Sequence, residues 1–143
     1  MFSSILCPLD FSTHSELALD YAIKLSRLTK AHVTIVHVVE ALFAAGVEAS
    51  GNREELNRQT QREIQDLLTR LAPGGDGERL GISVTVGDPG EQILQQIDDC
   101  QADLVVMGTQ GLEGAKRFMF GSTTERVLRE SRVPVLAVPA PEV

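Results

Sequence analysis

The sequence has little of what marks a disulfide-stabilised, membrane-spanning or nucleic-acid-binding protein. Its two cysteines, Cys7 and Cys100, have no CxxC spacing, and we interpret both as reduced structural residues. No apolar run approaches the roughly 20 residues of a spanning helix, and the N-terminus lacks the layout of a signal peptide. The net charge of -7 argues against broad binding to nucleic acid or to an anionic membrane. We therefore expect a cytoplasmic protein with no nucleic-acid partner and no membrane insertion.

The residue sets of common catalytic motifs are also missing. No GxxxxGK[ST] loop is present, and no GxGxxG follows the first apolar segment. No Ser-His-Asp or Cys-His set and no carboxylate cluster indicates a nucleophile or a metal cage. His14 is expected to be exposed near the end of the first strand, and His37 to be a core or pocket-wall residue. The sequence thus predicts no catalytic residue, no metal ligand and a protein that is not an enzyme.

What the sequence does contain is an alternation of two hydrophobic periods. Five short segments rich in β-branched residues predict strands, at residues 5–9, 32–39, 82–86, 102–107 and 133–138. Apolar residues at helical spacing predict four helices between them, the first with the stripe Leu17, Tyr21, Leu25 and Leu28. Such alternation implies βαβ crossovers, so we predict an α/β fold with an open, mostly parallel five-stranded sheet and helices on both faces.

The chain length and the connections complete the predicted organisation. At 143 residues, one domain over residues 1–143 is expected. The segment 40–52 is long and partly apolar, and we interpret it as a surface connection, with a lid over a ligand or a partner contact as alternatives.

The segment GTQGLEGAKRFMFGST, residues 108–123, is the most informative stretch of the chain. It joins the fourth strand to the last helix, and ligands bind parallel sheets at that edge. Glycines let a ligand approach the backbone, and a helix start binds phosphate. Ser122 is predicted to be the helix N-cap, with Glu125 completing a capping box. Two features stay open, namely Lys116 and Arg117 as phosphate contacts or solvated charges, and residues 118–120 as a hydrophobic clip or a partner surface.

The glycine spacing of this loop resembles that of a known family. Gly108-x2-Gly111-x9-Gly121-Ser122 is similar to the G-x2-G-x9-G-[ST] nucleotide loop of the universal stress proteins. Residues 5–12 (ILCPLDFS) resemble that family's first strand and the turn after it, His37-Val38 its second-strand ending, and residues 87–93 (GDPGEQI) the turn after its third strand. Its last two strands resemble residues 103–108 and 133–138, so that essentially the whole chain is covered.

The resemblance implies a Rossmann-like fold of the adenine nucleotide alpha hydrolase type, with strand order 3-2-1-4-5. It also implies an ATP-binding stress-response regulator, usually a homodimer formed through the last strands. Asp10 would hold the adenosine end; the alternative interpretation is a turn or cap carboxylate before the first helix. The nucleotide-binding residues carried over by position are Pro8, Leu9, Asp10, Val38, Met107, Gly108, Gln110, Gly111, Gly121, Ser122 and Thr123.

The cofactors implied are ATP and Mg²⁺, since ATP brings three to four negative charges to an acidic protein. Gln110 departs from the pattern, because histidine or arginine is common at this position in the ATP-binding branch. An amide donates a hydrogen bond but adds no charge, so phosphate affinity is expected to be lower.

Two alternatives to an ATP-binding regulator stay open at this point. The first is an interaction module of the same fold that binds no nucleotide and acts through dimer or protein-partner contacts. The second is a slow ATPase.

Overall fold

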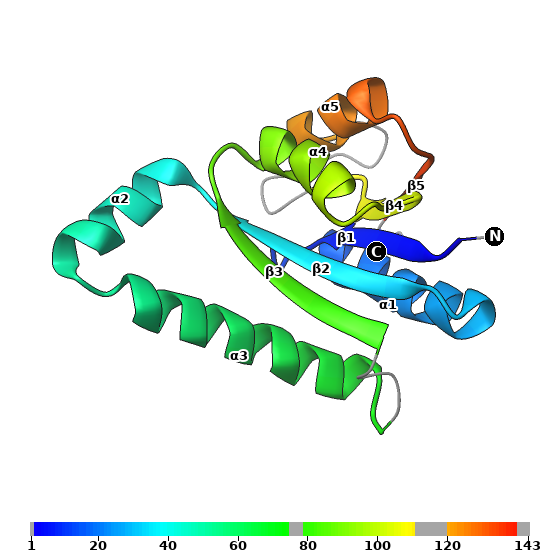
Figure 1. The fold of residues 1–143 in the computed structure, drawn as a ribbon, viewed down its shortest axis with the longest axis horizontal. Helices are drawn as coiled ribbons and strands as arrows, with labels where there is room; N and C mark the ends of the chain where they lie inside the picture. The colour runs from blue at the N-terminus through cyan, green and yellow to red at the C-terminus, as the bar shows by residue number, and fades with distance from the viewer. Residues whose placement is uncertain (1, 75–78, 111–119, 140–143) are drawn as a thin grey trace.

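The computed structural model describes residues 2–74, 79–110 and 120–139. Its centre is a five-stranded, fully parallel sheet in the order β3-β2-β1-β4-β5, which confirms the predicted fold class (Figure 1). The strands are β1 (Ser4–Pro8), β2 (His32–Val39), β3 (Leu80–Val86), β4 (Leu104–Gly108) and β5 (Val135–Val138). Their ends differ from the predicted ends by at most two residues.

Helices cover both faces of the sheet. Helices α1 (Thr13–Thr29) and α3 (Arg53–Leu71) lie on one face, and α4 (Pro89–Asp99) and α5 (Ser122–Glu130) on the other (Figure 1). Side chains of β1 alternate between the two cores: Ile5 and Cys7 pack towards α1 and α3, and Leu6 packs towards α4 and α5. All three are fully buried, as expected for a central strand.

The cysteines differ in their surroundings. Cys7 is completely buried, and this burial raises the pKa of its thiol to about 12. Cys100 follows α4, is half-buried, and its thiol donates to Gln96 Oε1 at 3.5 Å. Neither cysteine forms a disulfide.

Helix α1 is confirmed as a helix, but its core face is not the predicted stripe. Leu28 is 82% exposed and Tyr21 is 49% exposed. The residues buried against the sheet are instead Ala18, Leu19, Ala22 and Ile23. Small alanines bring the helix axis close to the strands, so the larger side chains of the predicted stripe lie at the margin of the contact or in solvent.

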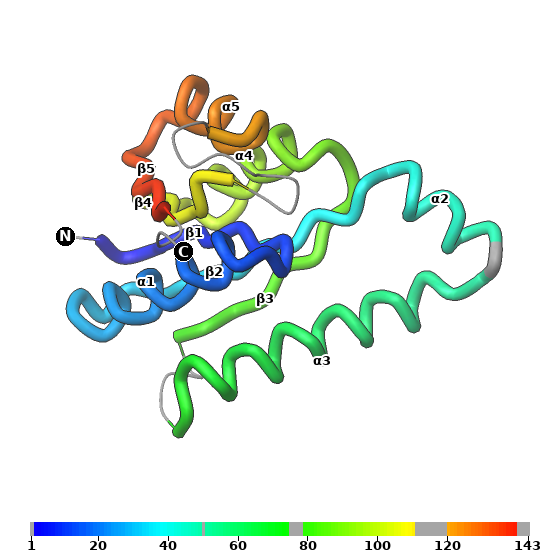
Figure 2. The backbone as a smooth tube through the Cα atoms, turned by 180° about the vertical axis from the view of Figure 1, so that it is seen from behind, coloured from blue at the N-terminus to red at the C-terminus, as the bar shows by residue number. Residues whose placement is uncertain are grey.

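The segment 40–52, expected to be a surface connection, contains a helix that the sequence did not predict, α2 (Ala41–Ser50). Helix α2 packs on α3, and the two views agree that it extends beyond the sheet (Figure 2). Leu42 and Phe43 are 88% and 61% exposed. The N-cap, Glu40, makes no side-chain capping bond, and α2 has no amphipathic stripe, so neither of the usual helix signals was available in the sequence.

Asp103 fastens the start of β1 to the chain just before β4. Its Oδ2 accepts from the Ser3 amide at 2.9 Å and from the Ser3 hydroxyl at 3.0 Å, and its Oδ1 accepts from the Ser4 amide at 3.1 Å. Desolvation alone raises the pKa of this carboxyl, but the hydrogen bonds outweigh it and hold the pKa below its ordinary value.

Candidate functional site

The chain reverses its direction of winding between β1 and β4. From β1 the strands run outward through β2 to β3, and from β4 they run outward to β5 (Figure 1). The turns that follow β1 and β4 therefore leave the sheet side by side at its carboxyl edge. In open parallel sheets this is the position where a crevice forms and ligands bind.

The turn after β1 is held by its own polar groups. Asp10 Oδ1 accepts from the Ser12 amide at 3.0 Å, and the Asp10 amide donates to Ser15 Oγ at 3.3 Å. Ser12 caps α1, because its Oγ accepts from the Ser15 amide at 3.1 Å. Phe11, between them, has φ +64°, an uncommon value for a residue other than glycine. The half-buried Asp10 is thus a turn carboxylate, placed at the carboxyl edge of the sheet.

The hydrogen-bonded pairing of β1 with β2 ends at Val36 and does not reach Val38. The last paired residues are Pro8 and Val36, and the Leu9 amide donates to the Val36 carbonyl at 2.8 Å. Backbone groups two residues apart point to the same side of a strand, so the amide and carbonyl of Val38 also point towards β1. The chain has already left β1 at that level. Among the described residues, none of the β1 ladder lies opposite Val38.

Gly108 ends β4 directly beneath the first turn of α1. A Cβ at Gly108 would lie 2.7 Å from His14 Cβ and 2.8 Å and 2.9 Å from the His14 backbone carbon and oxygen. On the other face, the Thr124 hydroxyl of α5 donates to the Gly108 carbonyl at 2.8 Å. The sequence suggested a ligand against this glycine, whereas in the structure its bare backbone is required by the close approach of α1.

The start of α5 differs from the predicted capping box. The Glu125 amide donates to the Gly121 carbonyl at 2.9 Å, so Gly121 is the N-cap and Ser122 the first helical residue. The prediction of Ser122 as N-cap is therefore wrong by one position. Glycine has no capping side chain, and the first amides of α5, which have no partner within the helix, point out of its N-terminus. The Gly121 amide donates to the Thr109 carbonyl at 2.8 Å and fixes this helix end beside β4.

A family model matches residues 1–139 of this sequence, that of the universal stress protein family. The chain belongs to the universal stress protein family. A curated member, the universal stress protein MJ0531 of Methanocaldococcus jannaschii, is 30% identical over 144 residues, which span 99% of this chain and 85% of the relative.

Solved structures of universal stress proteins have the same fold. The structure of MJ0577, another Methanocaldococcus jannaschii protein, is 28% identical, with a TM-score of 0.83 over 100% of this chain and 99% of that one. A universal stress protein in complex with cAMP is 24% identical, with a TM-score of 0.70 over 96% of both chains.

The residues that the universal stress protein pattern singled out fall into three groups. Asp10, the Val38 backbone and Gly108 come together at the carboxyl edges of β1, β2 and β4, and Gly121 is tied to the same edge. A second group is buried, which leaves mainly the backbone available to a ligand: Pro8, Leu9, Met107 and Gln110. A third group opens α5, where Ser122 is exposed and Thr123 is half-buried. The predictions made for Gly111, Lys116, Arg117 and residues 118–119 lie outside the described residues.

Two histidines have closer contacts at this edge than the sequence suggested. His14 is half-buried rather than exposed, and its Nδ1 lies 3.4 Å from Thr109 Oγ1. His37 Nδ1 lies 2.8 Å from the Leu9 carbonyl oxygen, and its ring packs on that of Phe11 at 5.1 Å between centroids. The family-like ending of the second strand was the only signal for His37. The contact of His14 with Thr109 joins residues 95 positions apart, and no pattern in the sequence indicated it.

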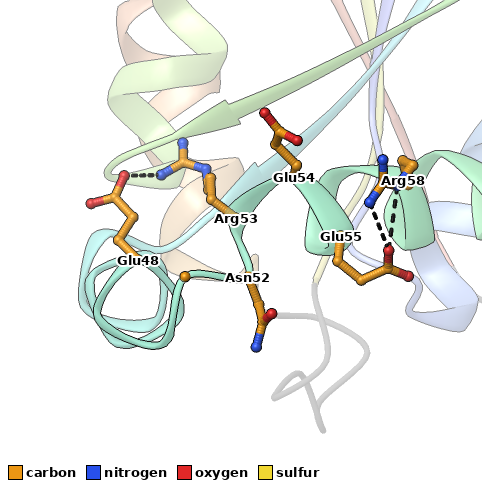
Figure 3. A pocket seen from close by; sticks show the side chains of 7 residues that line it. Glu48, Asn52, Arg53, Glu54, Glu55 and Arg58 are labelled. Atoms are coloured by element: carbon orange, nitrogen blue, oxygen red, sulfur yellow. Dashed lines mark hydrogen bonds and ion pairs between the residues drawn. The ribbon is translucent and has the colours of Figure 1, made fainter.

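Two open hollows lie away from this edge. One, of about 610 Å³, is at the elbow between α2 and α3 (Figure 3). Its charged walls pair with one another, since Arg53 bonds Glu48 and Arg58 bonds Glu55 at 3.0 Å. The other, of about 460 Å³, lies at the amino ends of β1, β2 and β3, around Arg79. Of the described residues in the turns that follow β1 and β4, none lines either hollow.

Two further kinds of site are absent from the described residues. In those residues, His, Cys, Asp and Glu side chains nowhere gather in threes as a metal site would need. None of their helices combines the length and the apolar character that crossing a membrane takes.

Proposed function

We propose that this protein binds an adenine nucleotide, ATP with Mg²⁺, at the carboxyl edge of β1, β2 and β4, and acts as a cytoplasmic stress-response sensor or regulator. The observation that carries the proposal is the backbone of Val38, whose amide and carbonyl point past the end of β1. The fold relative in complex with cAMP supports an adenine nucleotide as the ligand class.

The base end follows from the hydrogen-bonding pattern of one strand residue. An amide and a carbonyl on the same side of Val38 offer one donor and one acceptor, and the edge of adenine with N1 and the N6 amine requires that pair. With the ribose directed towards Asp10, the orientation of the base is fixed. Guanine would then place its O6 acceptor where adenine has the N6 donor, and its N1–H donor where adenine has the N1 acceptor. We therefore expect ATP to be preferred to GTP.

The phosphate end is proposed at the start of α5. Unpaired amides at a helix N-terminus, with their partial positive charge, attract anions. Gly121 at the N-cap leaves space beside them, and Ser122 and Thr123 contribute hydroxyl groups. Mg²⁺ would bind through the phosphates and reduce the repulsion between ATP and a chain with a net charge of -7.

A regulator is favoured over a fast enzyme because the described edge has few groups for acid-base chemistry. Among the described residues, His14 is the titratable side chain that packs against Gly108, and its Nδ1 faces a threonine hydroxyl rather than an orienting carboxylate. Slow ATP turnover stays as an alternative. The homodimer is proposed through β5, an edge strand that pairs only with β4 within the described chain and has Leu136 40% exposed.

The experiment is calorimetric titration of nucleotide-stripped protein with ATP and Mg²⁺, AMP, adenosine and GTP. We expect affinity to fall from ATP to AMP to adenosine and to be weakest for GTP. Gly121→Val should abolish the extra affinity that the phosphates give to ATP over adenosine, because the valine side chain would lie at the start of α5. Adenosine binding should be retained. Asp10→Ala should weaken adenosine and ATP alike.

The competing function, an interaction module that binds no nucleotide, predicts a different result. No heat with any nucleotide, together with an unchanged melting temperature in their presence, would refute nucleotide binding. Equal affinity of Gly121→Val and the unaltered protein for ATP would refute only the placement of the phosphates.

A further inference from the structure

His37 is bonded to the backbone of the neighbouring strand at the point where that strand ends. Its Nδ1 lies 2.8 Å from the Leu9 carbonyl oxygen. A carbonyl oxygen only accepts, so Nδ1 carries the proton and the ring is the donor. The ring also packs on Phe11, with centroids 5.1 Å apart and planes at 57°. His37 thus holds both Leu9 and Phe11 in the turn after β1.

The bond from His37 replaces one that the sheet would otherwise make. In a parallel ladder, the Leu9 amide donates to the Val36 carbonyl, and the next bond runs from the Val38 amide to the Leu9 carbonyl. The first of these is present at 2.8 Å, and in the described residues the second is not. The carbonyl that would accept it is engaged by the imidazole instead.

We propose that His37 is a positioning residue for the base: by holding the Leu9 carbonyl, it keeps the Val38 backbone open for the edge of adenine. This role rests on the nucleotide binding proposed above. His37 need not touch the ligand, and its action does not require a change of charge, because both the neutral ring with a proton on Nδ1 and the imidazolium donate from that atom.

Two variants separate the hydrogen bond from the ring contact. In His37→Asn the amide nitrogen is attached to Cγ as Nδ1 is in histidine, so a donor remains while the ring is lost. In His37→Phe the ring can still pack on Phe11, but no donor remains. Loss of the bond should lower adenosine affinity about tenfold in His37→Phe, with His37→Asn within about threefold of the unaltered protein.

A phosphate ligand without a base provides the internal control. Inorganic tripolyphosphate should bind both variants and the unaltered protein equally, because the start of α5 is not changed. Equal adenosine affinity in all three proteins would overturn the positioning role. A loss in His37→Asn with none in His37→Phe would also overturn it, because it would assign the effect to the ring contact rather than to the bond.

Measurements without nucleotide test the mechanism by itself. Nitrogen NMR shifts should show His37 protonated at Nδ1, and the Val38 amide should exchange with solvent faster than that of Val36. In His37→Phe, exchange at Val38 should slow as its amide takes the Leu9 carbonyl. An unprotonated Nδ1, or unchanged exchange, would refute this inference even if nucleotide binds; an unaltered protein that binds no adenosine would refute the proposed function together with the role of His37 in it.

Discussion

Replacing Gly108 by alanine should destabilise the protein without any ligand. The new methyl group would lie 2.7 Å from His14 Cβ and under 3 Å from two backbone atoms of the same residue. Carbon atoms in contact prefer about 3.5–4.0 Å. Because two of the three atoms are helix backbone, no side-chain rotation relieves the overlap, and α1 must shift over a core that contains its buried residues Ala18 and Leu19.

The magnitude follows from two opposing effects. Overpacking costs about 1–3 kcal/mol, and a backbone clash belongs at the upper end of that range. Alanine also reduces the freedom of the unfolded chain, which favours folding by about 0.4–1 kcal/mol. The φ angle of Gly108 is not positive, so alanine at this position adds no backbone strain. We expect a net loss of about 2 kcal/mol and a melting temperature lower by about 6 °C.

The assay is urea unfolding of nucleotide-free protein, followed by circular dichroism. Gly46→Ala is the matched control: it makes the same change in the middle of α2, where a Cβ would meet nothing within 4 Å. There we expect a gain of about 0.5–1 kcal/mol. A Gly108→Ala protein as stable as the unaltered one would refute the close packing of α1, and would return Gly108 to the role of a glycine required only by a ligand.

Three further perturbations test the fold around the site. Ser12→Ala should cost about 1 kcal/mol in urea unfolding, because the first turn of α1 loses its cap; no change would mean that water replaces it. A thiol reagent at pH 8 should modify Cys100 in the folded protein and Cys7 only after unfolding, since a pKa of about 12 keeps the buried thiol protonated; rapid modification of both would contradict the burial. The pKa of Asp103 is lower in the folded chain than in the unfolded one, so its contribution to the free energy of unfolding is complete above about pH 4 and is lost as the pH falls through the folded pKa. Asp103→Asn should therefore flatten the acid side of a plot of stability against pH. Parallel plots for the variant and the unaltered protein would contradict this contribution.

The layers of the fold were predictable because each strand and most helices carry their own pattern. The run from Leu104 to Met107 is apolar on both sides, as a central strand of a parallel sheet requires. Helix α2 was not predictable in this way. Its sequence, ALFAAGVEAS, has neither an amphipathic stripe nor a capping side chain, and it forms where it packs on α3.

The candidate site was predictable only in outline. Glycine spacing placed Gly108 and Gly121 at the carboxyl edge, but it could not show which surface approaches each glycine. His14 is 94 positions from Gly108, and no local pattern connects them. The bond from His37 to the Leu9 carbonyl also joins different strands, and it depends on where β1 ends, which is the least certain feature of a strand read from sequence.

The place of β1 in the sheet has a consequence for biosynthesis. Of the five strands, β1 is the first in the chain, yet it lies between β2 and β4, and its pairing with β4 begins at Leu104. While the last third of the chain is still on the ribosome, one edge of β1 has no partner, and that edge belongs to a strand of fully buried apolar residues. The nascent chain thus leaves an apolar strand unpaired on one side until β4 has been made. The proposed nucleotide site needs both β1 and α5, so nucleotide can stabilise only a chain that already includes α5.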